Sequence, residues 1–333
     1  MSRVTDNKFL RFVKDWTLPV AIAVGTVSYL TFYTVPQLDA LGNRLGPLFD
    51  TLFPLTVFLT LLFTFCKVDF HQMRPHRWHV GVLVAQLLLV ALVCVGCWFA
   101  SGAPTHKLLL EALLTCIIGP AASASPVVVG KLGGNISTMT TYVLISSLVS
   151  AVLIPLVFPL LEQTVHVDFL SAFLIILYKV ATVLLLPLVL GWLVQHYLPR
   201  LKQRIVAMPN LSFYSWAVSL SITTGITVKN IVHSDAGLPL LVAIAVASLL
   251  LCGVQFVVGR AVGRWFDERQ RVGDGTSGME VNAGQALFQK NTALSIWVSY
   301  MYLNPVASVG AGCYVLWQNV INSLELWQKR RET

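Results

Sequence analysis

The chain has 333 residues, of which 56% are apolar and only 11% are charged, and its net charge is +8. A soluble protein of this length would carry about twice that share of charged residues. The composition therefore excludes an ordinary soluble domain. The chain instead contains uncharged runs that reach the roughly 20 residues needed to cross a membrane.

Taken in chain order, these runs predict an all-α polytopic membrane protein with ten transmembrane helices. The turn-forming pair Asn304-Pro305 separates the last two spans. No small-residue cleavage site precedes the first long run, so we do not interpret the N-terminal segment as a removable signal peptide. The predicted spans cover residues 17–36, 47–66, 79–101, 108–130, 137–161, 168–195, 211–231, 237–262, 281–302 and 305–326.

The basic residues test this topology, because lysine and arginine mark cytoplasmic loops. With ten spans, 18 of the 23 basic residues fall at the termini or in alternate loops, and three fall on the opposite side. The other two, Lys179 and Lys290, lie inside spans. The split predicts that both termini are cytoplasmic, and it explains the positive charge by topology rather than by a nucleic-acid partner. We expect a monomer in a lipid membrane, the bacterial inner membrane in particular.

Ten spans also divide into two groups of five at about residue 164. An odd number of spans per half places the halves in opposite orientations, which is the inverted-repeat plan of many secondary transporters. The predicted units are residues 1–163, with spans 1 to 5, and residues 164–333, with spans 6 to 10.

The fourth span of each half is interrupted. In the first half, Gly119-Pro120 and Ser125-Pro126 interrupt an apolar run, and proline breaks or kinks a helix. A plain proline kink is the alternative interpretation. The second half places Gly284 before a polar centre that reads Gln285, Gln289, Lys290 and Asn291. We predict helix breaks at Gly119, Pro120 and Gly284.

Interrupted spans at matching positions of two halves are the best indication of a transporter's binding site in a sequence. If the two broken helices cross, their N-terminal ends suit an anion and their free carbonyl oxygens suit a cation.

Five segments in this order resemble motifs of the bile acid:sodium symporter family, and the resemblance covers nearly the whole chain. They are FCKVDFHQMRPHRWHVGVLVAQ, GPAASASPVVVGKLGGN, IPLVFP, GQALFQKNTALS and VLWQNVINSLELW. The resemblance implies a core domain with two crossing helices, a panel domain, and elevator-like or rocking movement between them. It further implies two sodium ions behind the crossing and an organic anion, bile acid-like or a small carboxylate, in front of it.

Carried over by position, the resemblance assigns two sets of residues. The ion-binding candidates are Gln86, Ser125, Ser147, Gln285 and Gln289, and the substrate-binding candidates are Ser123, Pro126, Lys290 and Asn291. The sequence departs from the family pattern at three positions. Pro126 and Lys290 stand where the family has asparagine, and Gln285 stands where it has a carboxylate. These departures weaken both implied sodium sites, and we expect no other cofactor or metal.

Lys290 leaves several interpretations open. The lysine could snorkel along its helix towards water. Its ammonium could instead replace a bound sodium ion, act as the counter-charge of an anionic substrate, or carry a proton in a proton-coupled carrier. Glu280 is a candidate for the missing carboxylate, although a solvated position beside the basic loop is favoured. Lys179 is a second candidate for a buried charge, and Glu111 is interpreted as interfacial.

The sequence therefore predicts a secondary active transporter of a small organic anion that works by alternating access. Its coupling to sodium follows from the resemblance, and the alternative is a sodium-independent or proton-coupled carrier. An intramembrane enzyme or a receptor is the rival class. The enzyme is disfavoured because the seven histidines cluster at loops and span ends and no span holds two aspartates, so we assign no catalytic residue.

Overall fold

The computed structural model describes residues 17–67, 73–161, 169–208, 211–233, 236–270 and 278–332. Regular structure within these ranges is helical, and a single isolated β-bridge joins two segments between helices. The long helices are α2 (Thr17–Thr34), α3 (Asp39–Phe65), α4 (Arg77–Phe99), α7 (Ile136–Leu161), α8 (Phe169–Tyr197), α10 (Leu211–Val232), α11 (Leu238–Gln270) and α14 (Ser308–Glu332). The shorter elements are α5 (Pro104–Thr115), α6 (Ser125–Leu132), α9 (Pro199–Val206), α12 (Met279–Phe288), α13 (Thr292–Tyr302) and the 3₁₀ turns η1 (Pro36–Leu38) and η3 (Pro305–Ala307).

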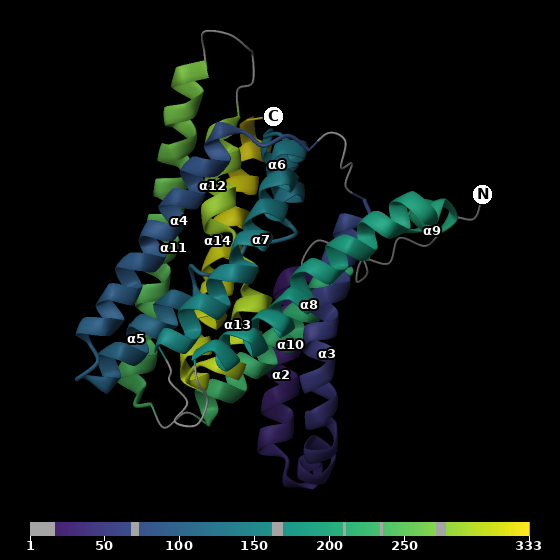
Figure 1. Ribbon diagram of the computed structural model, residues 1–333. Coiled ribbons are helices and arrows are strands. Elements are labelled where there is room, and N and C mark those ends of the chain that lie inside the picture. The colour runs from purple at the N-terminus through teal and green to yellow at the C-terminus, as the bar shows by residue number, and fades with distance from the viewer. Residues whose placement is uncertain are drawn as a thin grey trace.

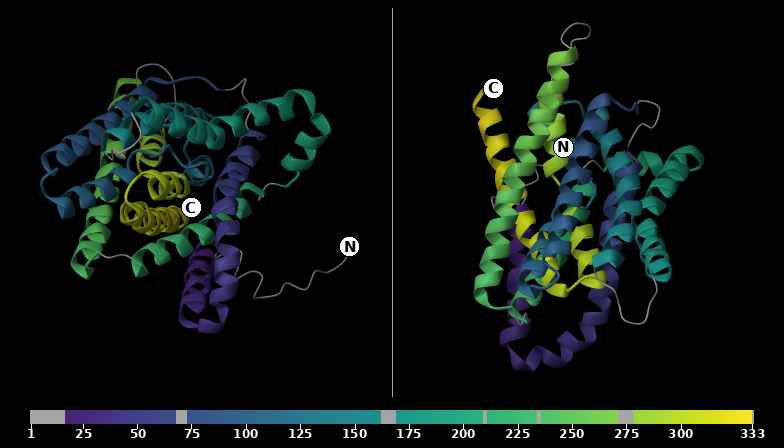
Figure 2. Two further views of the ribbon diagram at one scale, coloured as in Figure 1. Left: turned by 60° about the horizontal axis from the view of Figure 1, so that its bottom comes forward. Right: turned by 60° about the vertical axis from the view of Figure 1, so that its left-hand side comes forward.

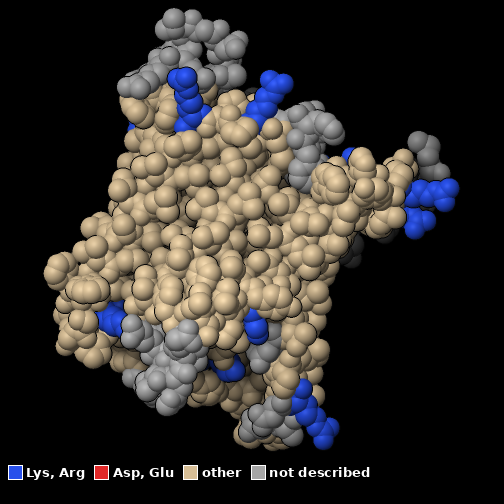
Figure 3. All heavy atoms as spheres, in the orientation of Figure 1, with Lys and Arg blue, Asp and Glu red and all other residues tan. Residues whose placement is uncertain are grey.

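Five stretches of helix in the described residues are long and apolar enough to cross a membrane: Arg44–Phe65, Arg77–Phe99, Ile136–Leu161, Phe169–Tyr197 and Leu238–Asp267. Their outward faces carry large apolar side chains. Leu88 and Leu92 on α4, for example, are 65% and 68% exposed, which is unfavourable in water and favourable in lipid. On one face of the molecule, a broad middle band of the main body shows neither basic nor acidic side chains (Figure 3). The chain is an all-α, multi-pass membrane protein.

The sequence-based spans agree closely with several helices of the structure. The helices α4, α7 and α8 begin and end within two residues of the spans predicted at 79–101, 137–161 and 168–195. In contrast, α3 begins at Asp39 rather than at residue 47, and α11 continues to Gln270 rather than ending at 262. Both helices continue into polar sequence, which lies outside the uncharged runs from which the spans were predicted. The short basic helix α9, at the far end of α8 in Figure 1, was not predicted.

The helices form two groups (Figures 1 and 2). In the first group, α10 packs against α2 and α3, and α3 packs against α8. In the second group, α12 packs against α11, α4, α6 and α7, while α14 packs against α11 and α13. The groups meet where α7 contacts α8 and where α10 contacts α13 and α14. The largest apolar cluster joins them, with Phe65 of α3, Leu184 of α8, Phe158 of α7 and Leu294 of α13 fully buried.

Glycines allow the closest helix contacts. A Cβ at Gly25 of α2 would overlap the carbonyl oxygen of Ser221 on α10. A Cβ at Gly310 of α14 would overlap the carbonyl oxygen of Ala112 on α5. Small residues at such points let helix backbones approach closely, which favours association inside lipid.

We predict that Gly310→Ala destabilises the protein by about 1–3 kcal/mol, because α14 must move away from α5. Gly253→Ala is the matched control, since a Cβ at Gly253 of α11 meets nothing within 4 Å. Thermal unfolding in detergent should show a melting temperature lower by several degrees for Gly310→Ala alone. Equal melting temperatures for the two variants would contradict this packing.

Candidate functional site

Two breaks in helices meet in the middle of the second group. The first is the segment between α5, which ends at Thr115, and α6, which begins at Ser125. The second lies between the end of α12 at Phe288 and the start of α13 at Thr292. Ala121 and Lys290 form an antiparallel bridge, Ala122 N donates to Gln289 O at 2.8 Å, and Asn291 N donates to Pro120 O at 2.8 Å. We call this paired region the crossing.

The breaks at Gly119 and Pro120 are present as predicted, but Gly284 is not a break. Gly284 lies inside α12, and the helix ends only after Phe288. A Cβ at Gly284 would lie 2.8 Å from Arg260 Cγ, and one at Gly259 would lie 3.0 Å from Gly284 Cα. The glycine therefore serves the close packing of α12 on α11 rather than a break.

Side chains from α4 and α7 hold the first break. Gln86 Nε2 donates to the carbonyl oxygens of Ile117 and Gly119, at 3.1 and 3.2 Å. Ser146 Oγ accepts from Ala121 N at 3.1 Å, and Ser150 Oγ donates to Ile118 O at 3.1 Å. These bonds satisfy backbone groups that an unwound helix would leave unpaired.

The hydroxyls of α7 that bond the first break are not the one predicted as an ion-binding candidate. Ser147, the predicted candidate on α7, is buried and donates to Val143 O of its own helix at 2.7 Å. Ser146 and Ser150 reach the break instead. Ser146 and Ser150 are four residues apart, which places them on one helix face. This spacing in the sequence could have indicated that both hydroxyls contact the same segment.

Side chains from α11 and α14 hold the second break. Gln318 of α14 accepts from Lys290 N at 3.0 Å and donates to Lys290 O at 3.3 Å. Tyr314 OH donates to Phe288 O at 2.7 Å and accepts from Gln255 Nε2 at 2.9 Å. Asn291 caps α13 by accepting from Leu294 N at 3.2 Å. Gln255, Tyr314 and Gln318 were not predicted. Polar residues within otherwise apolar spans are the sequence signal that could have identified them.

Four of the five predicted ion-binding residues carry a buried oxygen without a hydrogen-bond partner among the described residues. Such atoms are rare in folded proteins, and each indicates a missing water, ion or donor. Ser147 is the exception, because its hydroxyl is bonded to its own helix. The unpartnered atoms are Gln86 Oε1, Ser125 Oγ, Gln285 Oε1 and Gln289 Oε1.

Gln285 contacts a carboxylate that sequence reasoning did not assign to the site. Its Nε2 donates to Glu325 Oε2 of α14 at 2.7 Å and to Asn322 Oδ1 at 3.0 Å. Glu325 is largely buried and forms an ion pair with Arg260 of α11. Arg260 also pairs with Glu280 Oε1 at 3.2 Å. The buried carboxylate near position 285 therefore comes from α14 and already has a cationic partner.

The other charged residues singled out in the sequence take different positions. Glu280 pairs with Arg260 and, at 3.9 Å, with Arg264, so it faces the basic end of α11 as the favoured interpretation expected. Lys179 is exposed on α8 and is not buried inside the protein. Glu111 is buried inside the protein and pairs with Lys107 at 3.3 Å, one turn into α5.

Lys290 lies inside the protein. Its side chain is 1% exposed, and Nζ has no hydrogen-bond partner among the described residues. The snorkelling interpretation is therefore wrong, because a snorkelling lysine reaches water.

The residues of the crossing fit a sodium ion in ligand type but not in charge. Their unpartnered oxygens are neutral, and among the described residues no group of three or more His, Cys, Asp or Glu is placed to hold a metal. Glu325, the carboxylate that contacts Gln285, already pairs with Arg260, so the acceptors that the described residues offer a sodium ion here are neutral oxygens.

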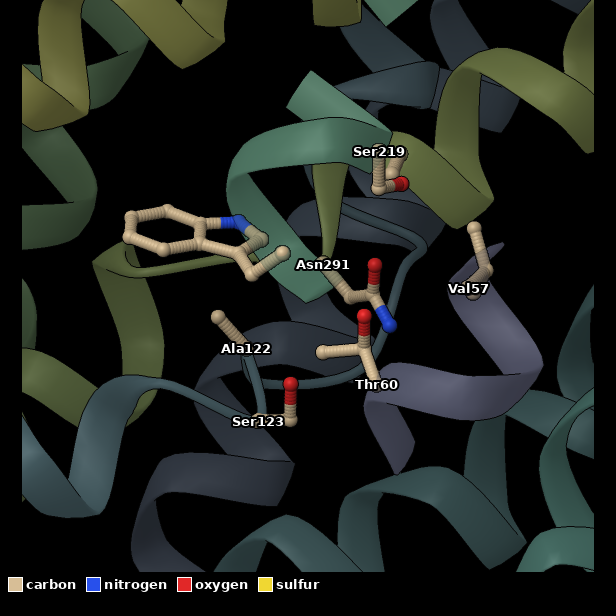
Figure 4. A pocket seen from close by; sticks show the side chains of 8 residues that line it. Val57, Thr60, Ala122, Ser123, Ser219 and Asn291 are labelled. Carbon is tan, nitrogen blue, oxygen red and sulfur yellow. The ribbon is translucent and has the colours of Figure 1, made fainter. Parts of the chain in front are cut away.

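A small pocket opens on the side of the crossing that faces the first group of helices (Figure 4). We call it the front pocket. Ser123 and Asn291, both predicted to bind substrate, line it together, whereas Pro126 and Lys290 are not among its lining residues. Its lining residues are Val57, Thr60, Ala122, Ser123, Trp216, Ser219, Asn291 and Ala293.

The pocket wall combines the two helix groups. Figure 4 shows Thr60 and Val57 on α3 and Ser219 on α10, with Asn291 between Ser219 and Thr60 and with Ser123 on the other side of Thr60 from Val57. Ser219 Oγ is buried and unpartnered among the described residues. Thr60, Trp216 and Ser219 were not predicted, because they reach this wall only through the packing of helices remote in sequence.

We predict that Gln318→Ala costs about 1–3 kcal/mol of stability, because it leaves Lys290 N unpaired inside the protein. Lys290 O would still accept from Thr292 N, at 2.9 Å. Asn319→Ala is the control, since Asn319 bonds only Val315 O of its own helix at 2.7 Å. Thermal unfolding in detergent measures both. A Gln318→Ala variant as stable as Asn319→Ala would show that the crossing does not depend on this bond.

Comparison with known proteins agrees with this architecture. The profile of the Sodium Bile acid symporter family matches residues 54–234, which include the first break, Gln86 and the pocket residues of α3 and α10. A search of curated proteins found no match. The family is one of transporters, and the profile covers more than half of the chain, which confirms the resemblance read from the motifs. The chain belongs to the Sodium Bile acid symporter family.

Proposed function

We propose that the protein is a secondary active transporter that carries a small organic anion across the membrane by alternating access. The observation that carries the proposal is the front pocket, which lies between the two helix groups with the crossing as one wall. A site at such a border changes its access when one group moves against the other, which is the general design of secondary transporters.

The proposed architecture is ten spans in two inverted repeats, residues 1–163 and 164–333. Two features support it. The broken helix α5–α6 and the broken helix α12–α13 occupy the fourth position in their halves, and their breaks pair with each other in antiparallel fashion. The moving units proposed are α2, α3, α8 and α10 on one side and the crossing-bearing helices on the other.

The proposed orientation places both termini in the cytoplasm of a cell with this protein in its cell membrane. The C-terminal end of α14 and the basic end of α11 lie at one end of the molecule, opposite the connection between α2 and α3 (Figures 1 and 2). Segregation of basic residues to the cytoplasmic side supports the assignment. We further propose that the protein acts as a monomer in lipid.

An anion is the proposed substrate because the N-terminal ends of two helices adjoin the pocket. Ser123 stands two residues before the start of α6, and Asn291 is the N-cap of α13. The positive ends of helix dipoles favour negative groups. The hydroxyls of Thr60 and Ser219 and the Ser123 side chain offer further hydrogen bonds.

The side chains that line the pocket are polar but uncharged, with hydroxyls from Thr60, Ser123 and Ser219 and the amide of Asn291. The mainly neutral lining supplies hydrogen bonds rather than a full positive charge, so the helix ends carry the electrostatic part of recognition.

The proposal is tested by uptake of radiolabelled organic anions into proteoliposomes. We expect at least one small carboxylate to accumulate, and the same anion to raise the melting temperature of the purified protein by mass action. If no anion either moves or stabilises the protein, the transporter function is excluded for this class of substrate.

We also predict that Ser219→Ala raises the KM for the transported anion about tenfold, as expected for the loss of one hydrogen bond of roughly 1.4 kcal/mol. The change removes an unpartnered hydroxyl without altering the helix. Ser323→Ala is the control, because Ser323 is exposed and bonds only Asn319 O of its own helix. An unchanged KM in Ser219→Ala would place the anion elsewhere.

A further inference from the structure

The short helix α9 follows α8 in the chain but does not continue its direction. Pro199 cannot extend the helix before it, and Leu198 has a non-helical backbone with φ −124° and ψ 62°. The chain therefore turns at this point, and α9 projects from the main body at the end of α8 (Figures 1 and 2). Most side chains of α9 are exposed, because the helix lies at the edge of the molecule.

Two hydrogen bonds hold α9 and the end of α8 beside the end of α3. Lys67 Nζ donates to Met208 O at 2.9 Å, just beyond the last turn of α9. Gln195 Nε2, in the last turns of α8, donates to Phe65 O at 2.7 Å. The stretch of α3 that can cross a membrane ends at Phe65, so this level marks the border of the hydrocarbon. The helix α9 thus has a fixed place at the membrane surface.

The last turns of α8 carry aromatic side chains of the kind found at such a border. Trp192 and Tyr197 are 46% and 63% exposed, and the His196 ring stacks on Trp192 with 5.5 Å between the ring centroids. Exposed tryptophan and tyrosine are enriched at membrane surfaces, because their rings are apolar while their N–H and O–H groups are polar. The helix that follows them therefore begins among the lipid headgroups.

An apolar face of α9 is only partly covered by the protein. Leu198, Leu201 and Ile205 are three and four residues apart, so they share one face. Ile205 is buried, whereas Leu198 and Leu201 beside it are exposed. Exposed leucines at the membrane surface lose free energy in water and gain it at the edge of the hydrocarbon.

Basic residues flank this apolar face, and the described part of the chain supplies no counter-charge for them. Arg200 and Arg204 lie on one flank, four residues apart, and Lys202 lies on the other. None of the three forms an ion pair with a described residue, and the sequence has no Asp or Glu between Asp168 and Asp235. Figure 3 shows basic side chains at the outer end of this arm and no acidic one on the same face.

We propose that α9 is an interfacial helix that binds anionic phospholipid in the leaflet where α3 and α8 end. Leu198 and Leu201 enter the border of the acyl chains, and Arg200, Lys202 and Arg204 bind the phosphate groups of the lipid heads. A helix with an apolar face and basic flanks lies in the plane of the membrane surface. Its affinity comes from the burial of apolar area together with the attraction of anionic lipid.

Anionic lipid fits this surface better than other negatively charged partners do. One face of an eight-residue helix offers less than the roughly 800 Å² per partner that a stable protein interface buries. A free phosphate ion would use the basic residues but not the exposed leucines beside them. A zwitterionic lipid carries its own cation next to the phosphate, which offsets the attraction to arginine and lysine.

This inference concerns a surface away from the crossing and goes beyond the proposed transport function. The helices that carry and hold α9, α8 and α3, belong to the first helix group. Bound lipid therefore anchors that group at the membrane surface.

The experiment maps lipid contacts on the full chain, reconstituted in phosphatidylcholine vesicles with a trace of photoactivatable lipid. The trace lipid is either phosphatidylglycerol or phosphatidylcholine with the same acyl chains, and peptide mass spectrometry measures labelling of residues 198–208. We expect phosphatidylglycerol to label this segment of wild type at least several-fold more than phosphatidylcholine does. In Arg200→Gln/Lys202→Gln/Arg204→Gln, affinity should fall on the order of a hundredfold, at about fivefold for each basic residue, and the preference should disappear.

The matched control is Arg74→Gln/Arg77→Gln/Lys131→Gln, which removes the same formal charge from exposed positions outside α9. Labelling of residues 198–208 in this control should stay at the wild-type level. Equal losses in the two triple variants would show an effect of net charge alone and would overturn the inference.

The comparison of the two lipids on wild type needs no variant, so it tests the inference even if a variant fails to fold. Equal labelling of α9 by both lipids overturns the inference, as does full displacement of the phosphatidylglycerol preference by millimolar inorganic phosphate. The readout is lipid contact rather than flux, so either result leaves the proposed transporter function standing.

Discussion

The antiparallel pairing of two unwound segments is the interaction on which the rest of this structure depends. Backbone that is neither helical nor paired is not tolerated at membrane depth, because water is absent there to satisfy its polar groups. Here the break in one helix supplies the partners of the other, through the bonds from Ala122 N to Gln289 O and from Asn291 N to Pro120 O. Pro120 has no N–H of its own, so it adds an acceptor without leaving a donor unpaired.

Buried polar side chains bond the backbone groups of the two breaks that the pairing leaves without partners. Gln86 and Ser150 bond carbonyl oxygens on one side of the crossing, and Tyr314 and Gln318 bond backbone groups on the other. Gln318 bonds the backbone of Lys290 with both its amide oxygen and its amide nitrogen, whereas the oxygen of Gln86 has no partner among the described residues.

Charged side chains are buried close to the crossing. Glu325, one of the buried carboxylates, is paired with Arg260, whereas Nζ of the buried Lys290 has no hydrogen-bond partner among the described residues. Position 285 carries an amide that contacts Glu325. The carboxylate beside position 285 therefore already has an arginine partner.

Much of this arrangement was predictable from local sequence. Apolar runs located the helices α4, α7 and α8 to within two residues, and the Gly119-Pro120 pair located the first break. The second break was located by its polar centre, although Gly284 was wrongly included because a helix contact with α11 tolerates glycine just as a break does. The contacts of Ser146, Gln318 and Trp216 were not predictable, since each depends on which helix packs beside the crossing and in what rotation. The amphipathic helix α9 was missed because it is short and polar.

In the proposed transport cycle, the front pocket changes its access from one side of the membrane to the other while it holds an anion. Ser123 lines this pocket at the crossing and is 8% exposed, so a cysteine placed there reports on access. This change of access is measured by labelling Ser123→Cys with a membrane-impermeant thiol reagent in vesicles of both orientations, with wild type as the background. We expect labelling from both sides and a slower reaction from each side when the transported anion is present. Labelling from one side only, at a rate that the anion does not change, would contradict it.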